Sequence, residues 1–345
     1  MNISKKVIAV AIASAFALAG CSQSGSNSQS SSQDGSKLSV KASFYPLQYL
    51  VEEIGGDHVS VDSLTPPGTD AHSLELSPKT VAELSQADAV VYLKGFQSAV
   101  DEAVKEAGPA NVLDVTEAAQ IVETSEDGHD DHEADEHAHE DHESHDHEGE
   151  DDNHEHLDDE HDHGDEEHHH HHDIDGDPHF WLDANRMATV ATQVGDLLAQ
   201  ADSDNADDYR KRAETVSQQM TDLANDMESG LEQCEKNTFI VSHQAFGYLA
   251  HNTGLHQVGV SGLDPEVTPS PERLKAIGEV VKDTGTQVIF TEVNVSPKVM
   301  EVLAEDLGIE TSVLDPIETL NDPEENYVSL MKTNLENLRK GLNCQ

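Results

Sequence analysis

The segment from 123 to 177, called here the acidic segment, separates the parts of the chain that can form a hydrophobic core from a part that cannot. It holds 27 acidic residues, 16 of the 22 histidines and no lysine or arginine. Such a composition cannot bury enough apolar surface to offset the entropy of ordering the chain, so we expect the acidic segment to be disordered when free of metal. The fold must therefore be built from the sequence on either side.

The charge of the whole chain limits its partners. There are 69 Asp and Glu against 19 Lys and Arg, which gives a formal net charge of -50. Nucleic-acid binding depends largely on basic residues that neutralise phosphates, so this charge excludes that class of function. A cation is favoured as the ligand instead.

Residues 1–20 have the pattern of an export signal peptide. Lys5 and Lys6 precede an uncharged run, 7–19, that is too short to span a bilayer. The run ends in Leu-Ala-Gly before Cys21, an ending that resembles the lipobox of bacterial lipoproteins, in which the cysteine is acylated after cleavage. We expect an exported protein that a lipid on Cys21 anchors to the cell membrane, periplasmic in a Gram-negative source, with 21–36 as a flexible Ser/Gln/Gly tether.

Short β-rich runs alternate with amphipathic helices on both sides of the acidic segment. Strand candidates lie at 37–44, 59–64, 89–93, 238–242, 257–260, 287–293 and 311–314. Helix candidates in the first half lie at 46–54, 78–86 and 97–107. This alternation predicts an α/β fold with mainly parallel sheets. We expect an N-terminal lobe at 37–182, which contains the acidic segment, and a C-terminal lobe at 235–345.

A long helical stretch at 183–234 connects the two predicted lobes. Its second helix, 205–233, carries an apolar stripe at alternating spacings of four and three, formed by Tyr209, Ala213, Val216, Met220, Leu223 and Met227. Such a stripe is typical of core packing, so we expect a long rigid helix between the lobes. Three further helix starts are predicted where Ser77, Ser270 and Ser296 each precede a proline, with the serine as N-cap.

Three of the six histidines outside the acidic segment stand where the chain changes direction. His72 lies in a turn-rich loop after a strand, His179 precedes a helix capped by Asp183, and His243 follows an apolar strand. In doubly wound folds, ligands bind at the carboxyl ends of strands. Imidazole nitrogen suits zinc, and three histidines with one carboxylate make a tetrahedral site.

Two carboxylates compete to complete this set. Asp315 follows an apolar strand and should project from the lobe that contains His243, and Glu292 follows another apolar strand. We favour Asp315 as the fourth ligand. Glu292 then accepts an imidazole N–H from outside the ligand set.

Together these motifs closely resemble the zinc-binding solute-binding components of bacterial metal ABC transporters. The resemblance rests on the lipobox, Gly-Thr-Asp-Ala before His72, Asp-Pro-His-Phe-Trp-Leu-Asp around His179, Ser-His-x-Ala-Phe-Gly-Tyr around His243, and Leu-Asp-Pro around Asp315. It implies two lobes joined by a stiff helix. It also implies a monomer that holds Zn(II) in the cleft with ligands from both lobes and delivers it to a membrane permease.

Two alternatives to a zinc-binding transport component are a manganese-binding component and a zinc enzyme. The family includes manganese binders, which tend to have a Glu where this chain has His243, so three nitrogen ligands favour zinc over manganese. A zinc enzyme is the rival class, but the sequence contains no His-Glu-x-x-His motif, and four protein ligands leave no reactive position. We therefore expect no catalytic residue.

The acidic segment supplies accessory metal ligands. Its spaced pairs are His137 and His139, His145 and His147, and His161 and His163. They could bind several zinc ions weakly, either to collect scarce metal or to sense an excess. The alternative function is that of a metal-buffering or adhesive surface lipoprotein, which would act mainly through this segment.

The two cysteines beyond the leader are Cys234, at the end of the long helix, and Cys344. In an oxidising compartment they could form a disulfide. Sequence alone leaves the pairing open, because it does not show whether the geometry allows it.

Overall fold

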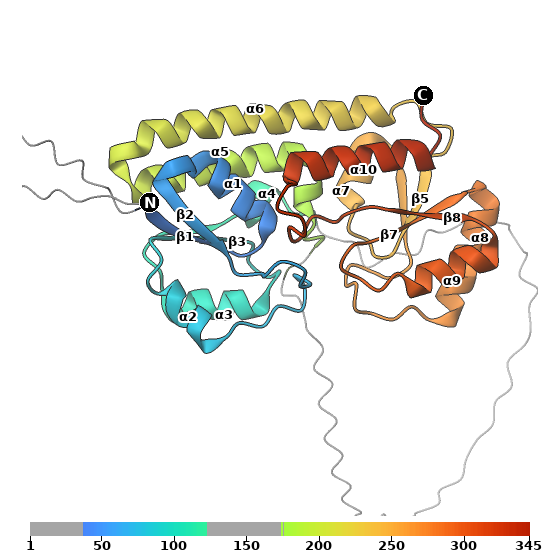
Figure 1. Ribbon diagram of the computed structural model, residues 1–345, viewed down its shortest axis with the longest axis horizontal. Helices are drawn as coiled ribbons and strands as arrows, with labels where there is room; N and C mark the ends of the chain where they lie inside the picture. The colour runs from blue at the N-terminus through green and yellow to red at the C-terminus, as the bar shows by residue number, and fades with distance from the viewer. Residues whose placement is uncertain (1–36, 123–173, 175) are drawn as a thin grey trace, which may run out of the picture. The chain divides into compact units, whose positions relative to one another are not determined.

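Two parallel sheets of four strands each form the framework of the computed structural model, which describes residues 37–122, 174 and 176–345 (Figure 1). The first sheet has the order β2-β1-β3-β4, and its strands are β1 (Leu38–Ala42), β2 (Val59–Ser63), β3 (Ala89–Tyr92) and β4 (Val112–Asp114). The second has the matching order β6-β5-β7-β8, with β5 (Thr238–Val241), β6 (His256–Gly259), β7 (Val288–Thr291) and β8 (Glu310–Val313). The prediction of an α/β fold with parallel sheets is confirmed, although β4 was not predicted.

Helices cover both faces of each sheet, as buried parallel sheets require. In the first lobe α1 (Tyr45–Gly55) and α5 (Ala184–Ala201) lie on one face, and α2 (Pro78–Leu84) and α3 (Ser98–Ala107) on the other (Figure 1). In the second lobe α7 (Gly247–Thr253) and α10 (Tyr327–Gly341) lie on one face, and α8 (Pro271–Thr284) and α9 (Lys298–Leu307) on the other. Short elements complete the lobes: α4 (Thr116–Ala119) and the 3₁₀ turns Gly56–His58, Phe180–Leu182 and Ser203–Asn205.

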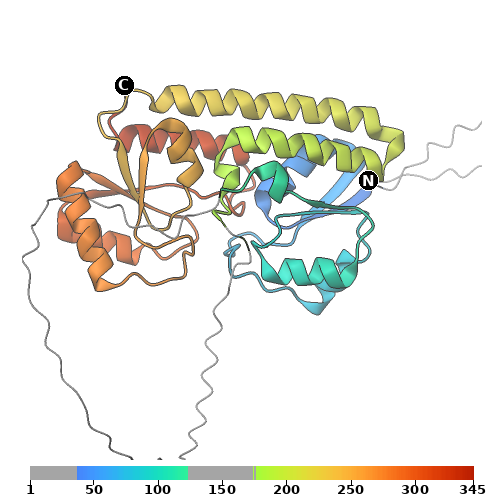
Figure 2. The same ribbon diagram turned by 180° about the vertical axis from the view of Figure 1, so that it is seen from behind.

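The helix α6 (Ala206–Leu231) packs against both lobes. It lies along α5 and α1 of the first lobe and contacts α7 and α10 of the second (Figure 2). Every residue of its predicted apolar stripe is buried, which confirms the prediction of core packing. A Cβ added at Gly195 of α5 would lie 2.5 Å from the Cβ of Ala213, so glycine at 195 lets α5 and α6 approach closely. The described residues from 37 onward belong to one compact unit, so the lobe boundaries at 182 and 235 stay predictions.

Two of the three predicted serine caps are confirmed. Ser77 accepts a hydrogen bond from the N–H of Thr80, and Ser270 accepts one from Arg273, each with proline in the first turn. Asp183 likewise caps α5. The prediction for Ser296 is wrong. Pro297 is itself the N-cap of α9, because its carbonyl accepts the first helical hydrogen bond, from Glu301 at 2.8 Å.

Several predicted features lie outside the described residues. These are the lipidation site Cys21, the tether, and the accessory ligands His137, His139, His145, His147, His161 and His163. In the described part of the chain, no helix combines the length and the hydropathy that crossing a bilayer requires.

Cys234 and Cys344 form a disulfide, which joins the end of α6 to the segment after α10. The two residues are 110 positions apart and also pair as an isolated antiparallel bridge. The bond therefore closes a loop that contains nearly the whole second lobe.

Removing this disulfide should lower the free energy of unfolding by about 2–5 kcal/mol, because a long loop is freed in the unfolded chain. Chemical denaturation of the Cys234→Ser/Cys344→Ser double variant against the oxidised parent measures the effect. The reduced parent is the control and should match the variant. Equal unfolding free energies for the oxidised parent and the variant would contradict the prediction.

Candidate metal centre

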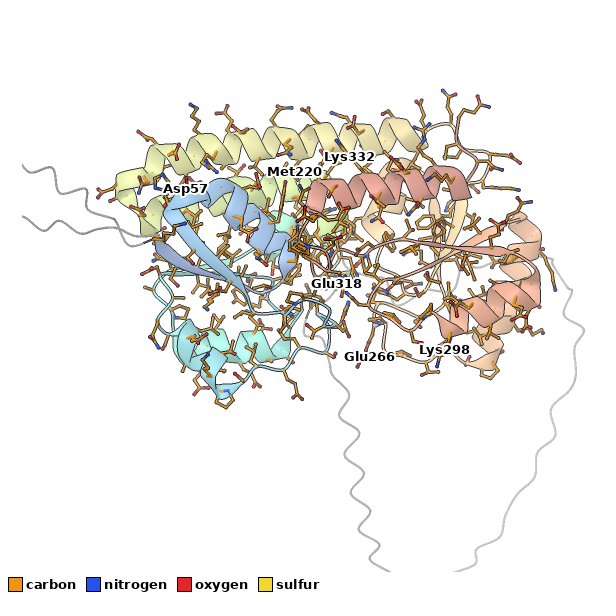
Figure 3. The ribbon with its side chains drawn as sticks, viewed as in Figure 1. Asp57, Met220, Glu266, Lys298, Glu318 and Lys332 are labelled. Carbon is orange, nitrogen blue, oxygen red and sulfur yellow. A yellow bond between two sulfur atoms is a disulfide. The ribbon has the colours of Figure 1, made fainter. Side chains whose placement is uncertain are left out.

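Four buried side chains, two from each lobe, converge between the two sheets. His72 lies in the loop after β2, His179 just before the 3₁₀ turn Phe180–Leu182, His243 two residues after β5, and Glu318 in the loop after β8. One ligand atom from each lies within 4.8 Å of all the others. Figure 3 labels Glu318, which lies between the lobes. The structure thus brings together the three predicted histidines with a carboxylate from the second lobe.

The spacing of these four atoms fits a tetrahedral ion. His179 Nε2 lies 3.2 Å from His72 Nε2 and 3.3 Å from His243 Nε2. Glu318 Oε1 lies 3.4 Å from His72 Nε2 and 3.8 Å from Nε2 of each of the other two histidines. Ligand atoms about 2.0–2.2 Å from a zinc ion stand about 3.3–3.6 Å apart in a tetrahedron. The observed separations scatter around this range, so the centre of the cluster has room for one such ion.

Carboxylates behind the cluster fix the orientation of two imidazole rings. His179 Nδ1 lies 2.7 Å from Asp177 Oδ1, and His243 Nδ1 lies 2.7 Å from Glu292 Oε2. A carboxylate accepts the Nδ1 proton, which leaves the lone pair on Nε2. Both rings therefore present Nε2 as an acceptor or ligand atom toward the centre.

Glu292 lies outside the cluster of four and contacts the Nδ1 side of His243. Its Oε1 also accepts hydrogen bonds from Ser242 Oγ at 2.6 Å and from the N–H of His243 at 3.1 Å. The contact arises because β5 and β7 are neighbours in the sheet, so the residues that follow them meet at the same edge. With three donors around it, the carboxylate holds His243 in a single orientation.

Asp177 has the equivalent role for His179, and sequence reasoning missed it. Its Oδ1 accepts both the N–H and the Nδ1–H of the histidine two residues later. An Asp-x-His spacing of this kind is a readable signal, since an Asp side chain often bonds to backbone two residues on. Because Asp177 is the last residue of the acidic segment, the composition of that segment conceals this signal.

The prediction of Asp315 as the fourth member of the cluster does not agree with the structure, which places Glu318 there. The Asp315 carboxylate turns back and accepts the N–H of Ile317 at 2.8 Å. The backbone of Asp315 is held by Asn334 of α10, which accepts its N–H and donates to its carbonyl. Asp315 therefore shapes the loop that directs Glu318 into the cluster. The physical reason is this local side-chain to backbone bond, which competes for the carboxylate.

The only tryptophan of the chain ties the His179 segment to the loop of Glu318. Trp181 Nε1 donates to the carbonyl of Pro316 at 2.7 Å, and its own carbonyl accepts from Tyr327 Oη. The indole is fully buried, and its ring centroid lies 5.2 Å from that of His179. The indole thus stands beside the cluster as an apolar wall and connects the segments that carry His179 and Glu318.

Over residues 40–341 the chain matches the family described as the zinc-uptake complex component A, periplasmic. The chain belongs to this family. The resemblance inferred from the sequence motifs is confirmed, and the family is one of solute-binding transport components.

Two relatives show how far the similarity extends. The chain is 31% identical over 308 residues to the zinc-binding protein AdcA of Streptococcus pyogenes serotype M3, an alignment that covers 88% of this chain and 56% of the relative. The chain thus spans about half the length of the first curated relatives it matches. It is also 31% identical over 337 residues, 96% of both chains, to the high-affinity zinc uptake system protein ZnuA of Bacillus subtilis strain 168.

Solved structures share the fold. The laminin-binding protein Lmb of Streptococcus agalactiae, described as having adhesin and metal transporting activity, superposes with a TM-score of 0.69 at 26% identity, covering 88% of this chain and 99% of that one. The Zn(II)-bound ZnuA-like domain of Streptococcus pneumoniae AdcA superposes with a TM-score of 0.66, also at 26% identity, covering 89% of this chain and 99% of that one.

The charges of the cluster favour a cation at its centre. Burial acts to raise the pKa of Glu318, but the neighbouring His72, His243 and His179 outweigh burial and lower this pKa to about 2. Glu318 is therefore ionised throughout the neutral range. Burial raises the pKa of Asp177 to about 7, although the N–H of His179 opposes the shift. Burial acts to lower the pKa of His243, yet the bond to Glu292 and its charge leave that pKa above its ordinary value.

Zinc affinity should fall as the pH falls below about 7, because a metal-bound imidazole must be neutral. The raised pKa of His243 means that protons compete with zinc already near neutrality. The affinity should change by up to about tenfold per pH unit for each proton that zinc displaces. Chelator competition at a series of pH values between about 5.5 and 8 measures it. An affinity independent of pH over this range would contradict the prediction.

Proposed function

We propose that this chain captures Zn(II) outside the inner membrane and delivers it to the permease of an ABC transporter. The proposed ligands are Nε2 of His72, His179 and His243 and Oε1 of Glu318. The observation that carries the proposal is the convergence of these four buried atoms, of whose six separations five are 3.2–3.8 Å and all lie within 4.8 Å. The family of the chain supports the same function.

The donor set supports zinc as the cargo. Three imidazole nitrogens and one carboxylate oxygen suit a borderline metal with four ligands, whereas manganese and calcium prefer more oxygen ligands. The zinc-binding relatives and the Zn(II)-bound structural neighbour point to the same metal. A manganese-binding component is therefore the weaker alternative.

A transport role also agrees with the closed ligand set. Four protein atoms would fill a tetrahedral site and leave no position for a reactive water, so the chain is proposed to bind its metal without catalysis. Ligands come from both lobes, so relative movement of the lobes would open the site. Zinc would favour the closed arrangement, and docking on the permease would favour the open one. The protein would act as a monomer on a lipid anchor at Cys21.

Zinc uptake by cells of the source bacterium tests this function. Cells that carry the His72→Ala chain in place of the parent should take up zinc from chelator-treated medium much more slowly than parent cells. Cells that carry a chain without residues 123–173, which keeps Asp177, are the matched control and should retain uptake. If the deletion abolishes uptake while His72→Ala does not, the metal-buffering or adhesive function of the acidic segment is the better account.

A further inference from the structure

The hydroxyl of Tyr248 joins the second lobe to the segment that carries His179. Tyr248 lies at the start of α7, and its Oη donates to the carbonyl of Asp177 at 2.7 Å while accepting from the N–H of Val122 at 3.0 Å. Asp177 and Val122 also bond to each other, through the N–H of Asp177 and the carbonyl of Val122 at 3.2 Å. One buried side chain of the second lobe thus holds two backbone segments, and that of Asp177 leads directly to His179 of the metal cluster.

We propose that Tyr248 is a positioning residue that sets how long zinc is retained. This inference rests on the proposed function above and adds a residue to it. Tyr248 fixes the backbone of Asp177, and the carboxylate of Asp177 holds both the N–H and Nδ1 of His179. A shift of Asp177 therefore passes directly to the imidazole at the centre of the cluster. Partners of this kind orient metal-binding histidines although they do not touch the metal.

A second contact from α7 reaches the same aspartate. A Cβ added at Gly247 would lie 2.7 Å from Asp177 Oδ2, so the carboxylate rests directly against the backbone of the first helical residue. The residues Gly247 and Tyr248 thus contact Asp177 at its carboxylate and at its carbonyl. The second lobe holds the aspartate from two sides, which argues against an incidental hydrogen bond.

The ring of Tyr248 is held in place independently of its hydroxyl. The guanidinium of Arg186 lies 4.4 Å from the ring centroid, and Arg186 Nε bonds to Asp183, the cap of α5, at 3.0 Å. Arg186 also donates to the carbonyl of Ala119. The change Tyr248→Phe should therefore keep the ring and its packing while it removes the two hydrogen bonds of the hydroxyl.

Zinc release from the full-length chain tests the proposal. The chain is loaded with one equivalent of Zn(II), a strong chelator is added in a stopped-flow instrument, and fluorescence of Trp181 is followed. This tryptophan is the only one in the sequence and lies beside His179, so its signal reports on the buried cluster. We expect Tyr248→Phe to release zinc about tenfold faster than the parent. Loss of a group that orients a metal-binding histidine typically lowers metal affinity by about 10–100-fold, and the expected change is the lower end of that range.

Tyr209→Phe is the matched control. Tyr209 is also a buried tyrosine whose hydroxyl donates a hydrogen bond, to Asp202 at 2.9 Å, but it lies on α6, and neither it nor Asp202 belongs to the cluster or bonds to Asp177 in the contacts described. Its variant should release zinc at the parental rate. A parental rate in Tyr248→Phe, or an equal acceleration in both variants, would overturn the proposal. Absence of a zinc-dependent signal in the parent itself would instead count against the proposed function.

Discussion

Replacing His179 with alanine should lower the affinity of the buried cluster for zinc by more than about 100-fold. Loss of a residue that only orients a metal ligand already lowers metal affinity by about 10–100-fold, and His179 is expected to bind the metal itself. Its Nε2 is also the atom that lies closest to both other imidazoles, at 3.2 and 3.3 Å. Chelator competition on the full-length chain, read by Trp181 fluorescence, measures the effect.

His251→Ala is the control for His179→Ala, because His251 is exposed on α7 and is not part of the cluster. This variant should bind zinc with parental affinity. The His179→Ala chain should still bind zinc weakly through its acidic segment, without the tryptophan response. An unchanged tight affinity in His179→Ala would remove this residue from the ligand set.

Glu318→Gln and Asp315→Asn should separate the two candidates for the fourth ligand. Glu318→Gln should weaken zinc binding by about 100-fold or more, because it removes the anionic ligand that the structure places among three imidazoles. Asp315→Asn should change the affinity by less than about threefold, since an asparagine oxygen can still accept the N–H of Ile317 and keep the turn. The same assay measures both.

The paired design makes the result decisive. Asp315 and Glu318 lie in the same loop, and each variant replaces a carboxylate with an amide of the same size. A large loss with Asp315→Asn and a small one with Glu318→Gln would restore the assignment made from the sequence. It would also show that the loop rearranges when metal binds.

The strand-end histidines were readable from the sequence because parallel sheets gather the residues that follow their strands. His243 and Glu292 follow β5 and β7, which are neighbours in the second sheet, so both lie at its carboxyl edge, and His72 follows β2 at the carboxyl edge of the first sheet. The long helix was readable from its stripe, since a spacing of four and three places residues on one face. These features depend on local sequence patterns and on the rule that ligands bind at the carboxyl ends of parallel strands.

Glu318 was not readable because its position depends on an unusual backbone. Ile317 has a φ of 59°, which β-branched residues rarely adopt, and it is fully buried. The positive φ of Ile317 and the turn made by the Asp315 side chain change the direction of the backbone after β8, just before Glu318. No sequence pattern signals a positive φ at an isoleucine. The short strand β4 was missed for a related reason, because three residues are too few for a periodic pattern.

The two carboxylate-imidazole pairs have a consequence for the speed of metal capture. Because Asp177 and Glu292 already hold their rings with Nε2 toward the centre, an arriving ion meets two ligand atoms that need no rotation or change of tautomer. The activation barrier for capture should then come chiefly from stripping water off the zinc ion and from the loops that carry His72 and Glu318. The Nε2 atoms of His179 and His243 would hold a scarce ion at its first encounter, before His72 and Glu318 bind it.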